Sequence, residues 1–559
     1  MTPIGNEPNT YPTTTRATPR ASCGSIVAEY REPPSARADP DGGASRAPGA
    51  RRYAERGPII WRRAARCLVP SDRDRPPCGS LAVAVGSSNS FDLVVLGAGT
   101  GGYSAAFRAA QLGLKVALVD EAKIGGTCLH SGCIPTKAML ESADFLDRVR
   151  HSDAYGVTTG AVALDYSTVA VRRQAVVDRL HKGLMSLVKK NKVEFIRGRG
   201  VLQGGQKIKL SKLDEAGQPA GEIVLEGTDV ILATGSRVKS LPGLRPDGQH
   251  IVTSDDVLSG DTLPASLIVV GAGAVGCEFA SFFADAGVQV TLLEYLPSIM
   301  ALEDADVSRD LARSFTKRGV KVITEARFDP ASVIVDERGV CVMVGQEGEQ
   351  PGELRAEQML VATGRAPNTD GVGLESTRAK VEKGLVQVDK RTMRTAQPHL
   401  YAIGDIIGGL WLAHVAAHEG IAAVHTIAGA ETEPIDYVKM PRATYCRPQI
   451  ASIGLTEAEC QRDGIPTKVG KVPFAAVGKA LIGGDSEGFT KVIAHRQTDE
   501  LLGVHMIGPH VTDLIAEAST AMLFEATAWE IGAAVHPHPT LSEALGEAAL
   551  AVDGRSINF

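Results

Sequence analysis

One pattern occurs twice along this chain: an apolar strand, a glycine-rich turn, a helix and a second strand that ends in an acidic residue. The first copy begins with FDLVVLGAGTGG at residues 91–102, and the second begins with ASLIVVGAGAVG at residues 265–276. In each copy the acid follows the first glycine of the turn by 23 residues. Strands that alternate with helices are typical of parallel sheets. The repeat therefore predicts an α/β protein with two units of the same kind.

Both turns carry the glycine spacing of a dinucleotide-binding motif. The first glycine permits a tight turn, the second lets the backbone approach a pyrophosphate, and the third lets helix and strand pack closely, while the start of the helix supplies partial positive charge. One such motif alone can be a turn without a ligand, but two copies in the same context indicate two bound dinucleotides. The glycines are Gly97, Gly99 and Gly102 in the first turn and Gly271, Gly273 and Gly276 in the second.

Asp120 and Glu294 end the second strands, where a carboxylate can accept hydrogen bonds from a ribose. A carboxylate at position 294 would also repel the 2′-phosphate of NADP. The segment that follows, residues 295–300, contains no arginine that could bind this phosphate. The alternative is an ordinary surface acid at a strand end, but beside the glycine turn we expect Glu294 to favour NAD.

The composition excludes several classes of protein. Apolar residues make up 44% of the 559 residues and charged residues 22%, as in ordinary globular proteins. No run of 18 apolar residues occurs, so no membrane-spanning helix is expected. After residue 90 the chain carries 46 basic against 57 acidic residues, and we expect no nucleic-acid partner. Nine cysteines are too few for a disulfide scaffold, which indicates a reducing compartment.

Only two of the cysteines lie close together, in the segment GGTCLHSGCIPTK at residues 125–137. Cys128 and Cys133 stand at the start of a predicted helix, where a thiol has a lowered pKa and is favoured as the reactive thiolate. The two can also close a disulfide across a distorted turn. A zinc site would need a second pair of ligands nearby, and none follows in the sequence. We therefore interpret the two cysteines as a reactive pair.

The segment GGTCLHSGCIPTK resembles the redox-active segment of the flavin-dependent disulfide reductases, the class I pyridine nucleotide-disulfide oxidoreductases. The resemblance covers residues 91–559 and is strongest to the dihydrolipoamide dehydrogenase branch of the family. Besides the cysteine segment and the two glycine turns, the matching segments are VILATGS at 230–236, MLVATGR at 359–365, YAIGD at 401–405, RPQIASIGLTEAE at 447–459 and HPHPTLSE at 536–543.

This resemblance implies the domain organisation of an α/β protein with two Rossmann-like domains, for FAD and NAD, and a C-terminal α+β dimerisation domain. Residues 1–88 hold 12 of the 30 prolines and no lysine, and we expect a disordered or non-native extension there, with a transit peptide as the alternative. The expected domains are residues 89–240 for FAD binding and the redox-active disulfide, 241–366 for NAD binding, 367–436 as a second, central FAD-binding segment, and 437–559 for dimerisation and the catalytic histidine.

The resemblance also implies which residues bind the cofactors. Lys137 matches a lysine near the flavin, and Glu278 is its expected ion-pair partner. The residues expected at FAD are Gly97, Gly99, Gly102, Asp120, Gly126, Thr127, Lys137, Gly200, Thr234, Gly235, Ser236, Asp405, Ala413 and His414. Those expected at NAD are Gly271, Gly273, Gly276, Glu278, Glu294 and Gly364.

The catalytic residues follow from the same resemblance. Cys128 matches the thiol that exchanges with substrate, and Cys133 matches the thiol adjacent to the flavin. His538 matches the base that takes a proton from dihydrolipoamide, and Glu543 matches the carboxylate that orients this histidine. In this family the histidine reaches the disulfide of the other subunit, which implies an obligate homodimer with shared active sites.

The implied activity is the oxidation of protein-bound dihydrolipoamide by NAD through the disulfide and FAD. The implied partners are a second copy of the chain and the lipoyl domains of 2-oxo-acid dehydrogenase complexes, or the carrier protein of glycine cleavage, and the expected location is the cytoplasm. Three alternatives stay open: a related FAD disulfide reductase, an NADH-dependent quinone diaphorase, and a component of a large assembly in which catalysis is incidental.

Overall fold

A computed structural model of the chain describes residues 89–430 and 432–559. The extension expected at residues 1–88 lies outside the described residues. None of the helices in the described part of the chain combines the length and the hydropathy that a membrane span requires. The described chain forms three sheets of five or six strands and several small ones.

The first α/β unit is built on a parallel sheet in the order β3–β2–β1–β5–β18. Residues 93–95 of β1 have no exposed surface, as expected of a strand whose sheet is covered on both faces. The strand β4 (Lys207–Leu213) joins β3 and β5 in an antiparallel extension. The parallel strands are β1 (Ser90–Leu96), β2 (Val116–Asp120), β3 (Glu194–Leu202), β5 (Pro219–Leu232) and β18 (Leu400–Ala402).

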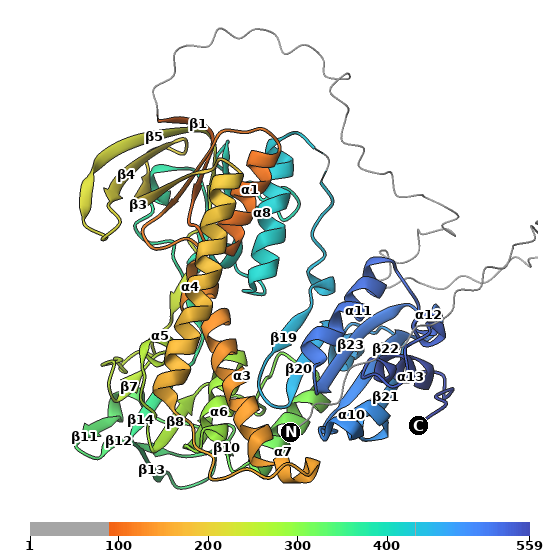
Figure 1. The fold of residues 1–559 in the computed structure, drawn as a ribbon. Coiled ribbons are helices and arrows are strands. Elements are labelled where there is room, and N and C mark those ends of the chain that lie inside the picture. The colour runs from red at the N-terminus through yellow and green to blue at the C-terminus, as the bar shows by residue number, and fades with distance from the viewer. Residues whose placement is uncertain (1–88, 431) are drawn as a thin grey trace, which may run out of the picture. The chain divides into compact units, whose positions relative to one another are not determined.

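Helices α1 (Thr100–Gln111) and α8 (Ala413–Ile427) lie side by side in this unit, although about 300 residues separate them (Figure 1). Glycines permit the approach, because a Cβ at Gly420 would lie 2.7 Å from the carbonyl oxygen of Gly101. Three other helices carry the chain from β2 to β3. They are α2 (Gly126–His130), α3 (Cys133–Arg150) and α4 (Tyr166–Lys190), of which α3 and α4 pack against each other.

The second α/β unit repeats the plan with a parallel sheet in the order β10–β9–β8–β14–β7. Its strands are β7 (Ile251–Val252), β8 (Ser266–Val270), β9 (Gln289–Leu293), β10 (Lys321–Ile323) and β14 (Gln358–Val361). Its helices are α5 (Ser254–Ser259), α6 (Ala274–Asp285) and α7 (Ala305–Lys317).

Small antiparallel sheets complete the second unit and connect it to the first. One sheet contains β11, β12 and β13. The pair β6–β15 connects the segment that leaves the first unit to the segment that returns to it, and the separate pair β16–β17 follows β15 in the chain. The strands are β6 (Ser236–Val238), β11 (Ile334–Asp336), β12 (Gly339–Val344), β13 (Gly352–Ala356), β15 (Arg365–Pro367), β16 (Val381–Glu382) and β17 (Leu385–Val386).

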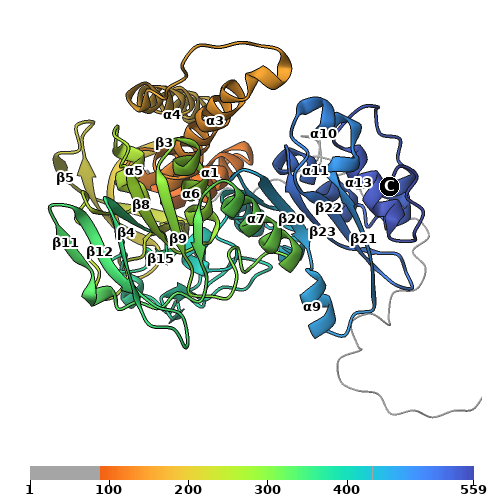
Figure 2. The same cartoon turned by 90° about the horizontal axis from the view of Figure 1, so that it is seen from below.

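The C-terminal part is an antiparallel sheet in the order β19–β20–β23–β22–β21 with helices packed on it (Figure 2). Its strands are β19 (Arg442–Thr444), β20 (Gln449–Gly454), β21 (Thr467–Pro473), β22 (Phe489–His495) and β23 (Leu501–Gly508). Its helices are α9 (Glu457–Arg462), α10 (Gly478–Gly483), α11 (Val511–Leu523), α12 (Ala528–Ala533) and α13 (Glu543–Ala551). The predicted fold class, two α/β units followed by an α+β domain, is confirmed.

Candidate active site

The first glycine turn leads from β1 into α1 and leaves no space for a side chain at its first and third glycines. A Cβ at Gly97, where φ is +104°, would lie 2.1 Å from the carbonyl oxygen of Ala233, and a Cβ at Gly102 would lie 1.8 Å from that of Gly97. No neighbouring atom lies within 4 Å of the Cβ position at Gly99. Asp120 accepts a hydrogen bond of 2.6 Å from the backbone N–H of residue 98, so its carboxylate is held at the turn.

The second turn has the same geometry. A Cβ at Gly276 would lie 1.8 Å from the carbonyl oxygen of Gly271, and the Cβ position at Gly273 is again open. Glu294 accepts a hydrogen bond of 2.7 Å from the backbone N–H of residue 272, as Asp120 does in the first turn. Gly364, with φ of +112°, follows β14, which neighbours β8 and its turn. Both turns therefore fit a pyrophosphate, with a carboxylate at the ribose position.

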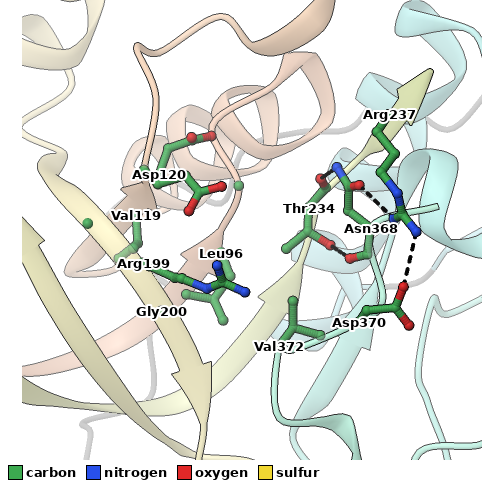
Figure 3. A pocket seen from close by; sticks show the side chains of 13 residues that line it. Leu96, Val119, Asp120, Arg199, Gly200, Thr234, Arg237, Asn368, Asp370 and Val372 are labelled. Carbon is green, nitrogen blue, oxygen red and sulfur yellow. Dashed lines mark hydrogen bonds and ion pairs between the residues drawn. The ribbon is translucent and has the colours of Figure 1, made fainter. Parts of the chain in front are cut away.

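A cavity of about 380 Å³ lies beside the first turn (Figure 3). Asp120, Gly200 and Thr234 line it, and a Cβ at Gly200 would lie 2.8 Å from the side chain of Leu96. Ligand pockets generally have volumes of about 300–1,000 Å³. The cavity is therefore large enough for the adenosine part of a dinucleotide whose pyrophosphate lies at the turn.

Residues 234–236, the turn after β5, are hydrogen-bonded to the segment that returns from the second unit. Ser236 donates a hydrogen bond to Asp405, and Arg365 Nε donates to Ser236 Oγ at 2.7 Å. Arg365 Nη2 also lies 3.4 Å from Thr127 Oγ1, its acceptor. Arg365, which was not among the predicted site residues, therefore connects two expected cofactor residues, Thr127 and Ser236, and Ser236 in turn bonds to a third, Asp405. Arg365 directly follows Ala-Thr-Gly in the segment MLVATGR at 359–365, and this position was the signal in the sequence that could have identified it.

A buried carboxylate, Glu419 of α8, fixes the turn that carries Asp405. It accepts hydrogen bonds from the backbone N–H of Gly404 at 2.7 Å and from the Tyr437 hydroxyl at 2.8 Å. Burial raises the pKa of Glu419. No sequence signal distinguished this glutamate from a surface acid. Ala413 and His414 begin the same helix, and His414 Nε2 bonds to the carbonyl oxygen of residue 441 at 2.9 Å.

Cys128 and Cys133 lie directly beside the first glycine turn. Gly126 packs so closely on Gly99 that a Cβ at position 126 would lie 2.6 Å from the Gly99 Cα. Cys128 follows in the short helix α2, and Cys133 is the first residue of α3. Both are half-buried free thiols, and a hydrogen bond links them.

The two thiols have different proton affinities. The pKa of Cys133 is lowered to about 7. The hydrogen bond from Cys128 and the Lys137 ammonium both lower this pKa, and burial opposes them. The same hydrogen bond, together with burial, raises the pKa of Cys128 well above its ordinary value. The reduced pair therefore carries its first negative charge on Cys133.

Lys137, one helical turn after Cys133, forms the expected ion pair with Glu278 of α6. Its Nζ lies 2.7 Å from both carboxylate oxygens of Glu278, whose side chain is only 6% exposed. The backbone N–H of Tyr445 donates to the same carboxylate at 2.9 Å, and the Tyr445 ring centroid lies 4.8 Å from Lys137 Nζ. Burial lowers the pKa of Lys137, but the Glu278 carboxylate outweighs it and the pKa is raised. A positive charge is therefore maintained close to the thiols.

His538 and Glu543 form a second pair, in the C-terminal domain. His538 Nδ1 lies 2.8 Å from Glu543 Oε1, and the other carboxylate oxygen accepts from the backbone N–H of Thr540 at 2.8 Å. Burial raises the pKa of Glu543, but these hydrogen bonds outweigh it and the pKa is lowered. An ionised Glu543 assigns the imidazole N–H to Nδ1 and leaves Nε2 free to accept a proton.

The His538 side chain is 78% exposed. Within the described residues, no hydrogen bond connects it to the cysteines of the same chain. The structure therefore presents two half-sites, the thiols with Lys137 on one and the histidine with its carboxylate on the other.

An arginine that lies far from Glu294 in the sequence is close to it in space. The backbone N–H of Ala326 donates to the carbonyl oxygen of Glu294 at 2.8 Å, and Arg327 Nη1 donates to that of Tyr295 at 2.7 Å. The Arg327 guanidinium carbon lies 3.7 Å from the Tyr295 ring centroid. Arg327 is not among the predicted cofactor residues, because it does not follow Glu294 directly in the sequence.

Comparison with known proteins agrees with this geometry. Residues 91–420 match the family model described as pyridine nucleotide-disulphide oxidoreductase, and residues 440–549 match the model of its dimerisation domain. The chain belongs to the pyridine nucleotide-disulphide oxidoreductase family. The predicted family, a flavoprotein oxidoreductase, is therefore confirmed, and the dimerisation domain supports the expected homodimer. FAD and NAD, the predicted cofactors, are those that the family uses.

Curated relatives narrow the comparison further. The chain is 47% identical over 477 residues to the dihydrolipoyl dehydrogenase of Bacillus subtilis, which covers 84% of this chain and 100% of that protein. It is 41% identical over 474 residues to the dihydrolipoyl dehydrogenase of Zymomonas mobilis, with the same coverage. Among solved structures, LpdA from Mycobacterium tuberculosis aligns with a TM-score of 0.75 and 29% identity over 82% of this chain and 98% of that one.

Proposed function

We propose that the chain oxidises protein-bound dihydrolipoyl groups to lipoyl disulfides and transfers the two electrons to NAD, the reaction of a dihydrolipoyl dehydrogenase. The observation that carries this proposal is the Cys128–Cys133 pair, held against the first of two dinucleotide-binding turns. A steady-state assay of the flavin-loaded protein with free dihydrolipoamide and NAD tests it, and we expect turnover. Absence of turnover, with reduction of quinones alone, would instead favour a diaphorase.

In this proposal FAD binds at the first turn and NAD at the second. When bound, FAD supplies the two-electron relay between thiols and nicotinamide that no side chain can provide. The protein's own contribution is to hold the dinucleotides through the glycine turns and the carboxylates of Asp120 and Glu294, and to keep the charge of Lys137 close to the thiols through Glu278.

The thiol chemistry begins with the disulfide form of the pair. A dihydrolipoyl thiolate attacks Cys128, the bond between the two cysteines breaks, and Cys133 leaves as a thiolate. The second dihydrolipoyl thiolate then attacks the mixed disulfide, which releases lipoyl disulfide and leaves both cysteines reduced. The Lys137 ammonium, which lowers the pKa of Cys133, favours the departure of Cys133 as a thiolate.

The proton lost by each dihydrolipoyl thiol needs an acceptor. His538 Nε2 supplies it, and Glu543 fixes the required tautomer and stabilises the imidazolium. Since the histidine and the thiols form separate half-sites in one chain, we infer that His538 serves the thiols of the partner subunit in the homodimer.

The protein partners of this reaction are the lipoyl domains of 2-oxo-acid dehydrogenase complexes or the carrier protein of glycine cleavage. We place the reaction in the cytoplasm, which is supported by the other four cysteines of the described residues, Cys277, Cys341, Cys446 and Cys460, all of them free.

The pKa of Cys133 predicts a pH profile for the reduced protein. We expect the rate of alkylation by iodoacetamide to rise through a midpoint near pH 7, because the thiolate is the nucleophile and Cys133 becomes a thiolate there. In a Cys128→Ala variant the hydrogen-bond donor is lost, and the midpoint should move towards the free-thiol value of about 8.5. Equal midpoints above pH 8 in both proteins would contradict the assignment.

The two glycine turns predict separable binding defects. Gly102→Ala should give protein that does not retain flavin absorbance, because the new Cβ would displace the backbone that approaches the pyrophosphate. Gly276→Ala should remain yellow but bind NAD at least about tenfold more weakly, the effect of losing one hydrogen bond to a charged group. Gly183→Ala, at an open position in α4, is the matched control. A yellow Gly102→Ala protein that loses NAD affinity would reverse the assignment of the turns.

A further inference from the structure

Beside Glu294 the structure places a guanidinium with no carboxylate partner. Glu294 uses its two carboxylate oxygens on the backbone N–H groups of residues 272 and 296, at 2.7 and 2.9 Å. In the part of the chain that the structure describes, the Arg327 guanidinium donates only to the carbonyl oxygens of residues 295 and 326, through Nη1. Within the described residues, no ion pair involves Arg327. A positive charge therefore lies next to the predicted ribose site without being neutralised.

Two contacts hold this guanidinium in place. The guanidinium carbon lies over the Tyr295 ring, 3.7 Å from its centroid. The chain segment of residues 325–327 runs beside that of residues 294–296 through backbone hydrogen bonds of 2.8 and 3.0 Å. The Tyr295 side chain itself is 66% exposed. The ring and the guanidinium are therefore exposed to solvent beside Glu294, whose carboxylate is expected to bind the ribose.

We propose that Arg327 is a second cofactor-specificity residue, which binds the adenosine end of the dinucleotide and is able to pair with a 2′-phosphate. This inference rests on the proposed binding of NAD at the second turn. A nearby arginine is the usual means by which such sites bind the 2′-phosphate, whereas a carboxylate at the strand end binds the 2′-hydroxyl. Here both groups are present, so rejection of the phosphate depends on Glu294 alone.

The test uses the flavin-loaded full chain and two probes, 5′-AMP and adenosine 2′,5′-bisphosphate, whose binding is measured by calorimetry. Glu294→Gln removes the repelling charge but keeps an acceptor for the backbone N–H of residue 272. We expect this variant to bind the bisphosphate at least tenfold more tightly than the unaltered protein, the size of one hydrogen bond to a charged group. The double variant Glu294→Gln, Arg327→Gln should lose that gain.

Arg338→Gln in the Glu294→Gln background is the matched control, because Arg338 is an exposed arginine of the same unit that pairs with Asp336. This control should keep the tenfold gain. The inference is overturned if Glu294→Gln does not improve binding of the bisphosphate, or if the double variant retains the gain. If the unaltered protein binds neither 5′-AMP nor NAD, the proposed function fails at the second turn and this inference fails with it. Relative kcat/KM with NADP and NAD provides a second readout.

Discussion

Replacement of Cys133 by serine should abolish lipoamide turnover, with a loss of about 10³-fold or more, because the disulfide that accepts the substrate's electrons cannot form. The flavin should stay bound, since the glycine turn and the Asp120 carboxylate that we propose as its binding site are unchanged. The measurement is the steady-state rate with dihydrolipoamide and NAD, together with the flavin absorbance of the purified variant.

A second assay separates this chemical defect from misfolding. Reduction of an artificial dye by NADH requires both dinucleotide sites but not the thiols, so it should continue in the Cys133→Ser protein. Cys341→Ala, which changes a free cysteine in β12 of the second unit, is the matched control and should retain lipoamide turnover. Full lipoamide activity in the Cys133→Ser variant would refute the assignment of the thiol pair.

Replacement of His538 by glutamine should lower kcat by about 10²- to 10⁴-fold, the usual contribution of a general base. The Glu543 carboxylate, which lies 2.8 Å from Nδ1 of His538, would then orient a side-chain amide that cannot act as a base. His151→Gln, at a histidine whose side chain is 71% exposed at the end of α3, is the control and should remain fully active.

A mixing experiment tests whether the histidine acts across the dimer. Dimers of Cys133→Ser and dimers of His538→Gln should each be inactive. If each active site combines the thiols of one subunit with the histidine of the other, a mixed dimer contains one site in which both the thiol pair and the histidine are intact. We therefore expect co-expression of the two variants to restore up to a quarter of the activity. That fraction follows because half of randomly assorted dimers are mixed and each has one of two sites intact. If activity is not restored although mixed dimers are isolated, the histidine serves its own chain.

The local motifs were predictable from the sequence because their geometry is determined by neighbouring residues. The turns at Gly97 and Gly271 have the backbone conformations that the glycine spacing requires, and the acids 23 residues later are at the turns as expected. The thiol pair at the start of a helix could also be inferred from spacing alone. The pairing of Lys137 with Glu278 came only from the family resemblance, because 141 residues separate the two side chains.

Contacts between distant segments were not predictable in this way. Arg365, Glu419, Tyr445 and Arg327 each reach the site from an element whose position depends on the packing of both units. Neither periodicity nor spacing distinguishes such a residue from one on the surface. The role of His538 across a dimer stays a prediction, since it depends on a second copy of the chain.

The position of β18 has a consequence for the synthesis of the protein. This strand completes the first sheet by pairing with β5, but 167 residues that include the whole second unit lie between the two strands. A growing chain therefore exposes all strands of the second sheet before the last strand of the first one is made. The second unit is able to fold while the ribosome is still translating, whereas the edge of the first sheet stays open until residues 400–402 emerge.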